Sequence, residues 1–282
     1  MSGHQDDETH EHDRGLSYDL PVLARRRMIR LMAGAGAALV PLVGCTADGS
    51  SSSTARTSPS ATGTRSATET DTTCAPIPEE TAGPYPGDGS NGVNVLKESG
   101  VVRTDITSSF GDSAGGTADG VPLTLTLTVV DAASGCGTPR KGAAVYVWHC
   151  DREGGYSLYT EGVTEENYLR GVQETDDQGR VTFTSVFPGC YPGRWPHVHF
   201  EVYGSLEDAT SATAITSTSQ LAFPKDVCDT VYATEGYEGS VANLRRLSLE
   251  SDMVFRDGHD HQLATVKGSA EEGYAASLTV AV

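Results

Sequence analysis

Two histidines separated by one residue, His197 and His199, are the residues of this chain best placed to do chemistry. Side chains alternate across a β-strand, so a strand here would put both imidazoles on one face. The β-branched Val198 and the aromatic Phe200 favour such a strand. Two adjacent imidazoles can bind one metal ion, although pairs with this spacing also occur as ordinary half-buried side chains. The neighbouring residues must decide between these two interpretations.

Two tyrosines are candidates to complete a metal site. Pro192 and Gly193 favour a bend that brings Tyr191 back toward the histidines. Tyr156 follows the pair Gly154–Gly155 just beyond a predicted strand, in the kind of loop that commonly carries function. A phenolate is a hard, anionic ligand that favours Fe(III), whereas imidazoles suit iron, copper or zinc. Two phenols beside two imidazoles therefore indicate a ferric site.

Short strands separated by turns must position these side chains. The clearest is Val121–Val130, where apolar residues alternate with threonine, which predicts one buried face and one wet face. A turn at Asp176–Gly179 leads into a second alternating segment, and no extended helical periodicity stands out. This pattern predicts an all-β fold, an antiparallel β-sandwich with long loops. The predicted strands are Val121–Val130, Ala143–Cys150, Arg180–Val186, Thr216–Phe223 and Ser277–Val282.

The charge of the chain narrows the classes of partner. Its formal net charge is −18 and its 20 Lys and Arg residues are scattered. No basic patch is available to neutralise phosphates, so nucleic-acid binding is not expected. The acidic surface favours solubility and does not identify a substrate.

Residues 1–45 have the pattern of a bacterial export signal. An arginine run at Arg25–Arg27 resembles a twin-arginine (Tat) signal, and an apolar stretch leads to Leu42–Cys45, which resembles a lipobox. This pattern predicts cleavage before Cys45 and lipid attachment to its sulfur, which would tether the protein to the membrane. The alternative is a spanning anchor, but the interrupted apolar run Met28–Gly44 is shorter than the about 20 residues that a spanning helix needs.

Residues 46–73 are predicted to form a disordered linker, because 16 of them are Ser or Thr and none has a large apolar side chain. Residues 74–282 have a length that suits one large β domain. Besides Cys45 the chain has five cysteines, which allow at most two disulfides and agree with export. The oligomeric state stays open, and so does the pairing among Cys74, Cys136, Cys150, Cys190 and Cys228.

Six segments, in order along the chain, resemble the motifs of the intradiol ring-cleavage dioxygenases. The resemblance is closest to an exported actinobacterial branch with a short segment between the second tyrosine and the histidines. It extends from about Cys74 to Phe255, so that the domain at residues 74–282 is identified as a dioxygenase-like catalytic β-sandwich. The matching segments are Glu80–Tyr85, Val147–Asp151, Gly155–Ser157, Tyr168–Gly171, Thr175–Gly179 and Tyr191–His199.

The resemblance implies a mononuclear non-haem Fe(III) centre that takes a catechol and O2 as substrates, with solvent as the fifth ligand. The catechol would bind through both oxygens and be cleaved between its hydroxylated carbons, giving a cis,cis-muconate-type dicarboxylate. The metal would act as Lewis acid and template. The implied metal ligands are Tyr156, Tyr191, His197 and His199.

The resemblance also assigns roles beside the metal. Tyr191 would leave the metal and accept a substrate proton, Arg194 would stabilise negative charge on the ring, and Gln220 matches a second polar neighbour of the substrate. Arg194 could instead be a surface charge, and Gln220 a solvent-facing strand residue. His149 is expected to hydrogen-bond within the scaffold. Cys190 replaces an aromatic residue expected at that position, and its thiolate is a further candidate ligand.

Two other functions stay open at this point. One is a non-catalytic exported β-sandwich that binds carbohydrate or another protein, with a structural or zinc-bound histidine pair. The other is a zinc or copper enzyme with the same four ligands. No residue distinguishes catechol from hydroxyquinol or protocatechuate as substrate. The expected location is the outer face of the cytoplasmic membrane as a lipoprotein, or the medium after secretion.

Overall fold

The computed structural model describes residues 74–113, 115–210 and 214–282. The predicted export signal at residues 1–45, with its lipid-attachment residue Cys45, and the predicted linker at residues 46–73 lie outside this part of the chain. Within the described part, the helices are too short or too polar to cross a bilayer.

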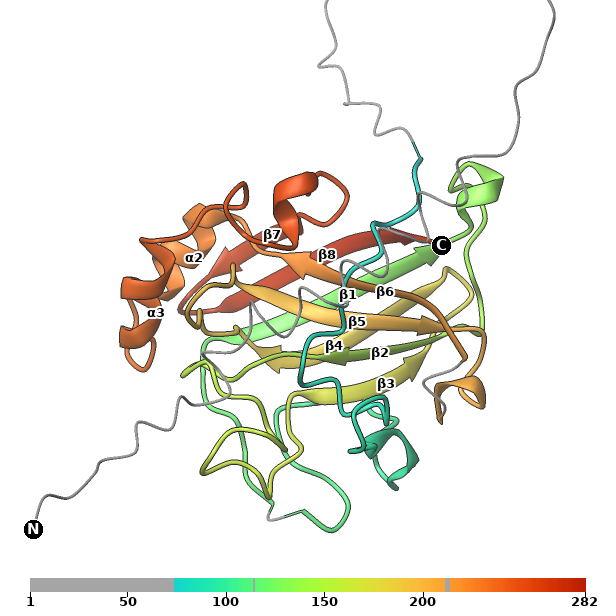
Figure 1. Cartoon of the computed structure of the whole chain (residues 1–282). Helices are drawn as coiled ribbons and strands as arrows, with labels where there is room; N and C mark the ends of the chain where they lie inside the picture. Colours follow the sequence, from blue (N-terminus) through green and yellow to red (C-terminus); the bar gives the residue numbers. More distant parts are fainter. Residues whose placement is uncertain (1–73, 114, 211–213) are drawn as a thin grey trace, which may run out of the picture. The chain divides into compact units, whose positions relative to one another are not determined.

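Two four-stranded sheets pack against each other as a β-sandwich (Figure 1). One sheet has the strand order β4-β1-β8-β7, and the other has the order β3-β2-β5-β6. The all-β fold class with long loops that the sequence predicts is confirmed. The strands are β1 Pro122–Val130, β2 Ala144–Trp148, β3 Arg170–Glu174, β4 Arg180–Val186, β5 His197–Tyr203, β6 Ile215–Ala222, β7 Thr265–Ser269 and β8 Gly273–Ala281.

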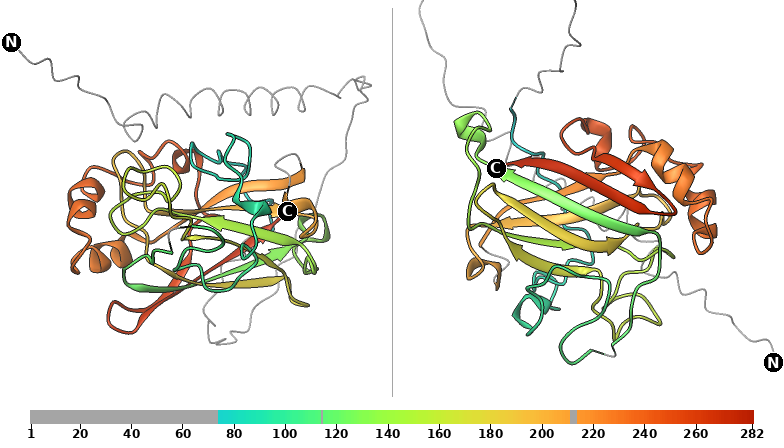
Figure 2. Two further views of the ribbon diagram at one scale, coloured as in Figure 1. Left: turned by 90° about the horizontal axis from the view of Figure 1, so that it is seen from below. Right: turned by 180° about the vertical axis from the view of Figure 1, so that it is seen from behind.

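Helices are few and short in the described residues. The helices α2, Lys225–Val231, and α3, Glu238–Leu244, lie together at one end of the sandwich in all three ribbon views (Figures 1 and 2). Single 3₁₀ turns occur at η2 Val95–Lys97, η3 Ala132–Ser134, η4 Asp208–Thr210 and η6 Phe255–Asp257. The sheets, not the helices, therefore form the frame of the candidate site.

The alternating pattern of β1 builds the core. Leu123, Leu125 and Leu127 are at most 1 % exposed, while the threonines between them lie toward solvent. Val181 and Phe183 of the antiparallel neighbour β4 extend the same buried face. Removal of these apolar side chains from water is the main force that holds the two sheets together.

The strands β1 and β8 pair in parallel, with Leu125 opposite Ala276. The sequence predicts an antiparallel sandwich, and this one parallel pair departs from that prediction. The other pairs of named strands are antiparallel. Parallel neighbours need a long connection, and here the second sheet and both helices lie between β1 and β8 in the sequence. A pattern within one strand carries no information about so distant a partner.

The two faces of β5 have different roles. Val198, Phe200 and Val202 belong to the core that the two sheets share. His197 and His199 alternate with them and therefore lie on the opposite, outer face of the second sheet. The strand and the common face that the sequence predicts for the histidines are thus confirmed.

A segment before β1 covers the outer face of the second sheet. The segment begins at the first sheet, where the Ile77 N–H donates to the Ala281 carbonyl of β8 at 2.8 Å. It then reaches the second sheet, where the Glu80 N–H donates to the Thr218 carbonyl of β6 at 2.8 Å. Farther along, this segment forms a second apolar cluster with side chains of β2. In Figure 1 it is the blue-green strip that crosses the strands. The outer face of the sheet is therefore buried rather than open to solvent.

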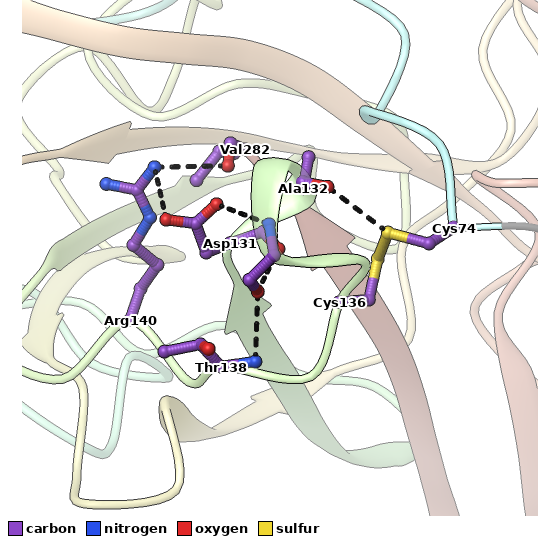
Figure 3. The surroundings of a disulfide bond; sticks show 8 residues. Cys74, Asp131, Ala132, Cys136, Thr138, Arg140 and Val282 are labelled. Carbon is purple, nitrogen blue, oxygen red and sulfur yellow. Dashed lines mark hydrogen bonds and ion pairs between the residues drawn. A yellow bond between two sulfur atoms is a disulfide. The ribbon is translucent and has the colours of Figure 1, made fainter.

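A disulfide joins Cys74 to Cys136 (Figure 3). Cys136 follows η3 after β1, where the Asp131 side chain accepts a hydrogen bond from the Ser134 N–H at 3.2 Å. The disulfide joins the start of the described chain to this turn. It is one of the cysteine pairings that the sequence left open. The remaining cysteines of the described residues are buried free thiols, Cys150, Cys190 and Cys228.

The predicted strand boundaries are close to those observed. The strand at Arg180–Val186 has the predicted ends, and the segment predicted as Ser277–Val282 belongs to the longer Gly273–Ala281. The strands β3 and β7 and both helices were not predicted. Each helix has 7 residues, too few to display apolar periodicity over several turns. The edge strand β7 is mostly exposed and lacks apolar alternation.

Candidate active site

His197 and His199 meet on the outer face of β5. Their Nε2 atoms lie 3.0 Å apart, and each residue is 2 % exposed. The His199 ring stacks on Trp148 of β2, with 4.9 Å between ring centroids and 7° between planes. Gly83 lies against the same ring, since a Cβ on it would be 3.3 Å from His199 Cε1. His199 Nδ1 has no hydrogen-bond partner among the described residues.

The tautomer of His197 follows from its neighbour. Its Nδ1 contacts the carbonyl oxygen of Trp195, which can only accept, so Nδ1 carries the hydrogen and Nε2 keeps a lone pair. Burial lowers the pKa of His197, and the Arg194 charge acts in the same direction. Burial and then His197 lower the pKa of His199 well below its ordinary value. Both rings are neutral at neutral pH, the form in which imidazole binds a metal.

Two loops bring phenol groups to the histidines. Tyr156 comes from the β2–β3 loop and Tyr191 from the β4–β5 loop. Their Oη atoms lie 3.4 and 3.3 Å from His197 Nε2 and 3.5 Å from each other. Tyr156 is 2 % exposed, whereas Tyr191 is half-buried. Burial raises the pKa of Tyr156 well above its ordinary value although the Arg194 charge lowers it, so this phenol is neutral in the metal-free protein.

The spacing of the four donor atoms fits one small metal ion. Donors about 2.0 to 2.2 Å from an ion, at tetrahedral or right angles, lie about 2.8 to 3.6 Å from one another. The distances between neighbouring donors are 3.0 to 3.5 Å. In the part of the chain that the structure describes, no group of three or more His, Cys, Asp or Glu could hold a metal. The phenol and imidazole set is therefore the candidate metal centre there.

Asp151 shapes the loop that carries Tyr156. Its Oδ1 accepts hydrogen bonds from the N–H groups of Gly155 and Glu153, at 2.7 and 3.1 Å. Its Oδ2 accepts one from the Tyr168 hydroxyl at 3.3 Å. Burial raises the pKa of Asp151 to about 6. These bonds close a tight turn, from which Tyr156 enters the site at a fixed position.

Close backbone contacts join this loop to the loop of Tyr191. Gly189 donates its N–H to the Asp151 carbonyl at 2.9 Å. A Cβ on Gly189 would lie 2.5 Å from the Arg152 carbonyl oxygen, so only glycine fits there. Gly154, with a φ of 92°, lies against Tyr191 in the same interface. The positions of the two phenols therefore depend on each other.

Arg194 is a buried cation beside the donor atoms, not a surface charge. It is 6 % exposed, and it donates from Nη2 to Gln220 Oε1 at 2.6 Å and from Nε to Asp252 Oδ2 at 3.1 Å. Burial lowers the pKa of Arg194, but the charges of Asp252 and Tyr191 raise it by more, so the guanidinium stays charged. Gln220 is fully buried on β6 and donates to the Thr81 carbonyl at 2.9 Å, so it does not face solvent.

His149 and Cys190 lie outside the donor set. His149 is hydrogen-bonded to the Cys150 carbonyl and to Ser185 Oγ, each at 2.7 Å, which is the scaffold role that the sequence predicts. Cys190 Sγ donates to the Arg194 carbonyl at 3.6 Å, and burial raises the pKa of Cys190 to about 12. A protonated thiol directed at a carbonyl group is not a metal ligand in this arrangement.

Asp252 belongs to the site but was not identified from the sequence. It lies 58 residues after Arg194, between α3 and η6, and is fully buried. Its local hydrogen bonds go to the N–H groups of Val254 and Phe255, the pattern of an ordinary aspartate turn. Sequence reasoning had no signal for its contact with Arg194, because that contact exists only in the folded chain.

The chain matches known proteins over the region that contains this site. A family model described as "Dioxygenase" matches residues 101–255, more than half of the chain, and this range includes all four donor residues. A solved structure, an intradiol ring-cleavage dioxygenase from Tetranychus urticae, superimposes with a TM-score of 0.56 at 26% identity. The superposition covers 74% of this chain and 94% of that chain.

Two sequence relatives are named catechol 1,2-dioxygenase. The relative from Candida albicans is 26% identical over 160 residues, which cover 50% of this chain and 52% of the relative. The relative from a Pseudomonas species is 38% identical over 73 residues, which cover 26% of this chain and 23% of the relative. The chain thus spans about half, or less, of the length of these relatives.

Proposed function

Since this chain belongs to the intradiol ring-cleavage dioxygenase family, we propose that it opens the ring of a catechol-type aromatic with O2. Cleavage between the two hydroxylated carbons would give a cis,cis-muconate-type dicarboxylate. The proposal is carried by the convergence of two phenol oxygens and two imidazole nitrogens within 3.0 to 3.5 Å of their neighbours. The names of the two catechol 1,2-dioxygenase relatives agree with this substrate class.

The donor set suits a mononuclear non-haem Fe(III) ion, held by Tyr156, Tyr191, His197 and His199. When bound, such an ion supplies a Lewis acid and a template for a vicinal diol. Hard phenol oxygens favour Fe(III) over the zinc and copper alternatives. Tyr156 is neutral in the metal-free protein, so loading with metal and loss of its proton would be coupled.

Tyr191 is the phenol suited to move a proton. It is half-buried and is followed by the exposed Pro192 and Gly193, whereas Tyr156 is 2 % exposed. A group that takes a substrate proton must be reachable from the substrate and have freedom to shift. We therefore assign acceptance of the proton to Tyr191 Oη, while Tyr156 keeps a fixed place.

Arg194 would place a fixed positive charge beside the bound substrate. Its guanidinium interacts electrostatically with Tyr191 and Tyr156, and a hydrogen bond to Gln220 Oε1 holds one of its nitrogens. A preorganised cation in a buried site stabilises negative charge that develops on a bound ring. Gln220 assists by keeping this nitrogen in place.

Metal loading followed by oxygen uptake tests the proposed function. Protein loaded with Fe(III) should show visible absorption from phenolate-to-Fe(III) charge transfer and should consume O2 with a catechol while a muconate-type product forms. The same protein loaded with zinc is the control and should do neither. A protein that takes up no iron, and consumes no O2 with catechol, hydroxyquinol or protocatechuate, would support the non-catalytic binding module instead.

We also propose that the protein works outside the cytoplasm as a lipoprotein. The support is the Arg25–Arg27 run, the Leu42–Cys45 segment and the disulfide between Cys74 and Cys136, a bond that persists in oxidising compartments. Fractionation of cells that express the full chain tests this location. The protein should partition with membranes, and Cys45→Ala should release it. Wild-type protein in the cytoplasm would contradict the proposal.

A further inference from the structure

Asp252 is a buried carboxylate with both oxygens held. Its Oδ2 accepts hydrogen bonds from Arg194 Nε at 3.1 Å and from the Trp195 N–H at 2.7 Å. Its Oδ1 accepts hydrogen bonds from the N–H groups of Val254 and Phe255, at 2.8 and 3.3 Å. With donors on both oxygens, the carboxylate has one orientation and presents a fixed negative charge to the guanidinium.

The other end of Arg194 is held as well. Its Nη2 donates to Gln220 Oε1 at 2.6 Å, and Gln220 Nε2 donates to the Thr81 carbonyl at 2.9 Å. The backbone carbonyl of Gln220 accepts a hydrogen bond from Gln262 Nε2 at 3.2 Å, which holds the residue itself in place. The guanidinium therefore lies between a carboxylate on one edge and an anchored amide on the other. The planar guanidinium fork allows both contacts at once, which a lysine ammonium would not.

The charge of this pair is not screened by solvent. Arg194 is 6 % exposed and Asp252 is 0 % exposed. Burial alone would raise the pKa of Asp252, but the Arg194 charge and the Trp195 N–H lower it by more, so the carboxylate is ionised. Removal of one partner from such a pair leaves an uncompensated buried charge, which must move or recruit water. The position of the guanidinium thus depends on Asp252.

We propose that Asp252 is a positioning residue that fixes the guanidinium of Arg194 in the direction of the bound catechol. The inference rests on the proposed function, because it concerns where Arg194 meets substrate. Asp252 acts through Arg194 and has no contact with the donor atoms of the candidate metal centre among its hydrogen bonds. Its role is therefore distinct from that of a metal ligand.

A double-mutant cycle of Asp252→Asn and Arg194→Met tests this role. Asparagine keeps an oxygen for the Trp195 N–H but loses the charge that holds the guanidinium. The probe is anaerobic binding of 4-nitrocatechol to the Fe(III)-loaded protein, followed by its visible absorption. Asp252→Asn should weaken binding by about 10- to 100-fold, the size expected for a misplaced charged group. With Arg194→Met already present, Asp252→Asn should change the affinity by less than about twofold. A difference of that size is within the scatter with which the effects of independent substitutions add.

Asp88→Asn is the matched control. Asp88 is 1 % exposed, and its Oδ1 accepts hydrogen bonds from the N–H and hydroxyl of Ser90. Asparagine keeps the oxygen that Ser90 bonds, so this loss of a buried charge away from Arg194 should not weaken binding of 4-nitrocatechol. Unfolding of the four metal-free proteins of the cycle gives a second measurement, in which Asp252 and Arg194 should be coupled.

Two results would overturn the role of Asp252. One is an equal loss of affinity in both backgrounds, since Asp252 would then act by another route. The other is wild-type affinity in Asp252→Asn. If Asp252→Asn does not fold, Asp252→Glu keeps the charge but moves it by one methylene and should still weaken binding at least about tenfold. Wild-type affinity in Asp252→Glu would then reject the role. Failure of the wild-type protein itself to bind 4-nitrocatechol would reject the proposed function instead.

Discussion

Gly154 packs directly against Tyr191, and a Cβ on Gly154 would lie 3.1 Å from the Tyr191 Cβ. Gly154 also has a φ of 92°, in a region that residues with a Cβ rarely adopt. The contact joins the loop that carries Tyr156 to the loop that carries Tyr191. The spacing of the Tyr156 and Tyr191 phenols should therefore depend on the size of the residue at position 154, although Gly154 is not itself a donor.

Gly154→Ala should move Tyr191 away from the histidines. The added methyl group combines backbone strain with a steric contact, and the free energy of unfolding should fall by about 1 to 3 kcal/mol. In the Fe(III)-loaded protein, the visible absorption of the phenolates should also shift. Chemical denaturation and absorption spectra measure the two effects. Gly162→Ala is the control, because Gly162 has a φ of 88° and no atom within 4 Å of an added Cβ. If both variants changed the spectrum equally, the contact with Tyr191 would not matter.

Asp151 should make the metal-free protein less stable as pH rises. Burial raises its pKa to about 6 in the folded state, against about 3.9 in an unfolded chain. Below about pH 3 the carboxyl is protonated in both states and carries no penalty. As pH rises from about 4 to 6, the unfolded state ionises first, so folding loses about 2 to 3 kcal/mol relative to Asp151→Asn. Urea denaturation of both proteins across this pH range measures the difference.

Asp176→Asn provides a control of opposite sign for the pH experiment. The N–H of Arg180 lowers the pKa of Asp176, as does that of Gln178. Stability from this group is therefore present above its unfolded pKa and is lost as pH falls through the folded pKa. Wild type should gain stability relative to Asp176→Asn as pH rises. The same sign for both substitutions would refute the burial argument for Asp151.

The disulfide between Cys74 and Cys136 should stabilise the domain. It joins residues with a sequence separation of 62, and closure of a loop of this size is worth about 2 to 4 kcal/mol. Reduction of the wild-type protein should lower its unfolding free energy by this amount, while reduction should have no effect on the double variant Cys74→Ala with Cys136→Ala. Before reduction, peptide mapping should find Cys74 joined to Cys136 and should find Cys150, Cys190 and Cys228 as thiols. A disulfide-linked peptide with any other cysteine pair would contradict this pairing.

The parts of the site that follow from local sequence were predictable. The His197 and His199 pair lies on one face because strand alternation is a local property, and the bend at Pro192 and Gly193 allows Tyr191 to return toward it. The alternation of Leu and Thr in β1 likewise predicts a half-buried strand. These features depend on residues within one turn or strand of each other.

The parts that depend on distant segments were not predictable. The contact between Asp252 and Arg194 joins a loop after α3 to the β4–β5 loop, and no residue type near Asp252 indicates it. The parallel pairing of β1 with β8 likewise joins the first and last strands of the described chain. Such pairings are chosen by the packing of the whole sandwich, which a single sequence does not reveal.

The two phenols should respond differently to loss of the hydroxyl. Tyr156→Phe removes the buried phenol that keeps a fixed place and should lower both iron occupancy and visible absorption. Tyr191→Phe removes the half-buried phenol that we expect to leave the metal during turnover, so iron should still bind with weaker absorption. Turnover should nevertheless fall by about 10²- to 10⁴-fold, because the proposed proton acceptor is gone. Iron content, spectra and oxygen uptake measure these effects.

Tyr159→Phe is the matched control for both variants. The Tyr159 hydroxyl is hydrogen-bonded to Gly87 and Asn91 outside the donor set, so its loss should leave the iron content unchanged. Full oxygen uptake by Tyr191→Phe would contradict its role as proton acceptor.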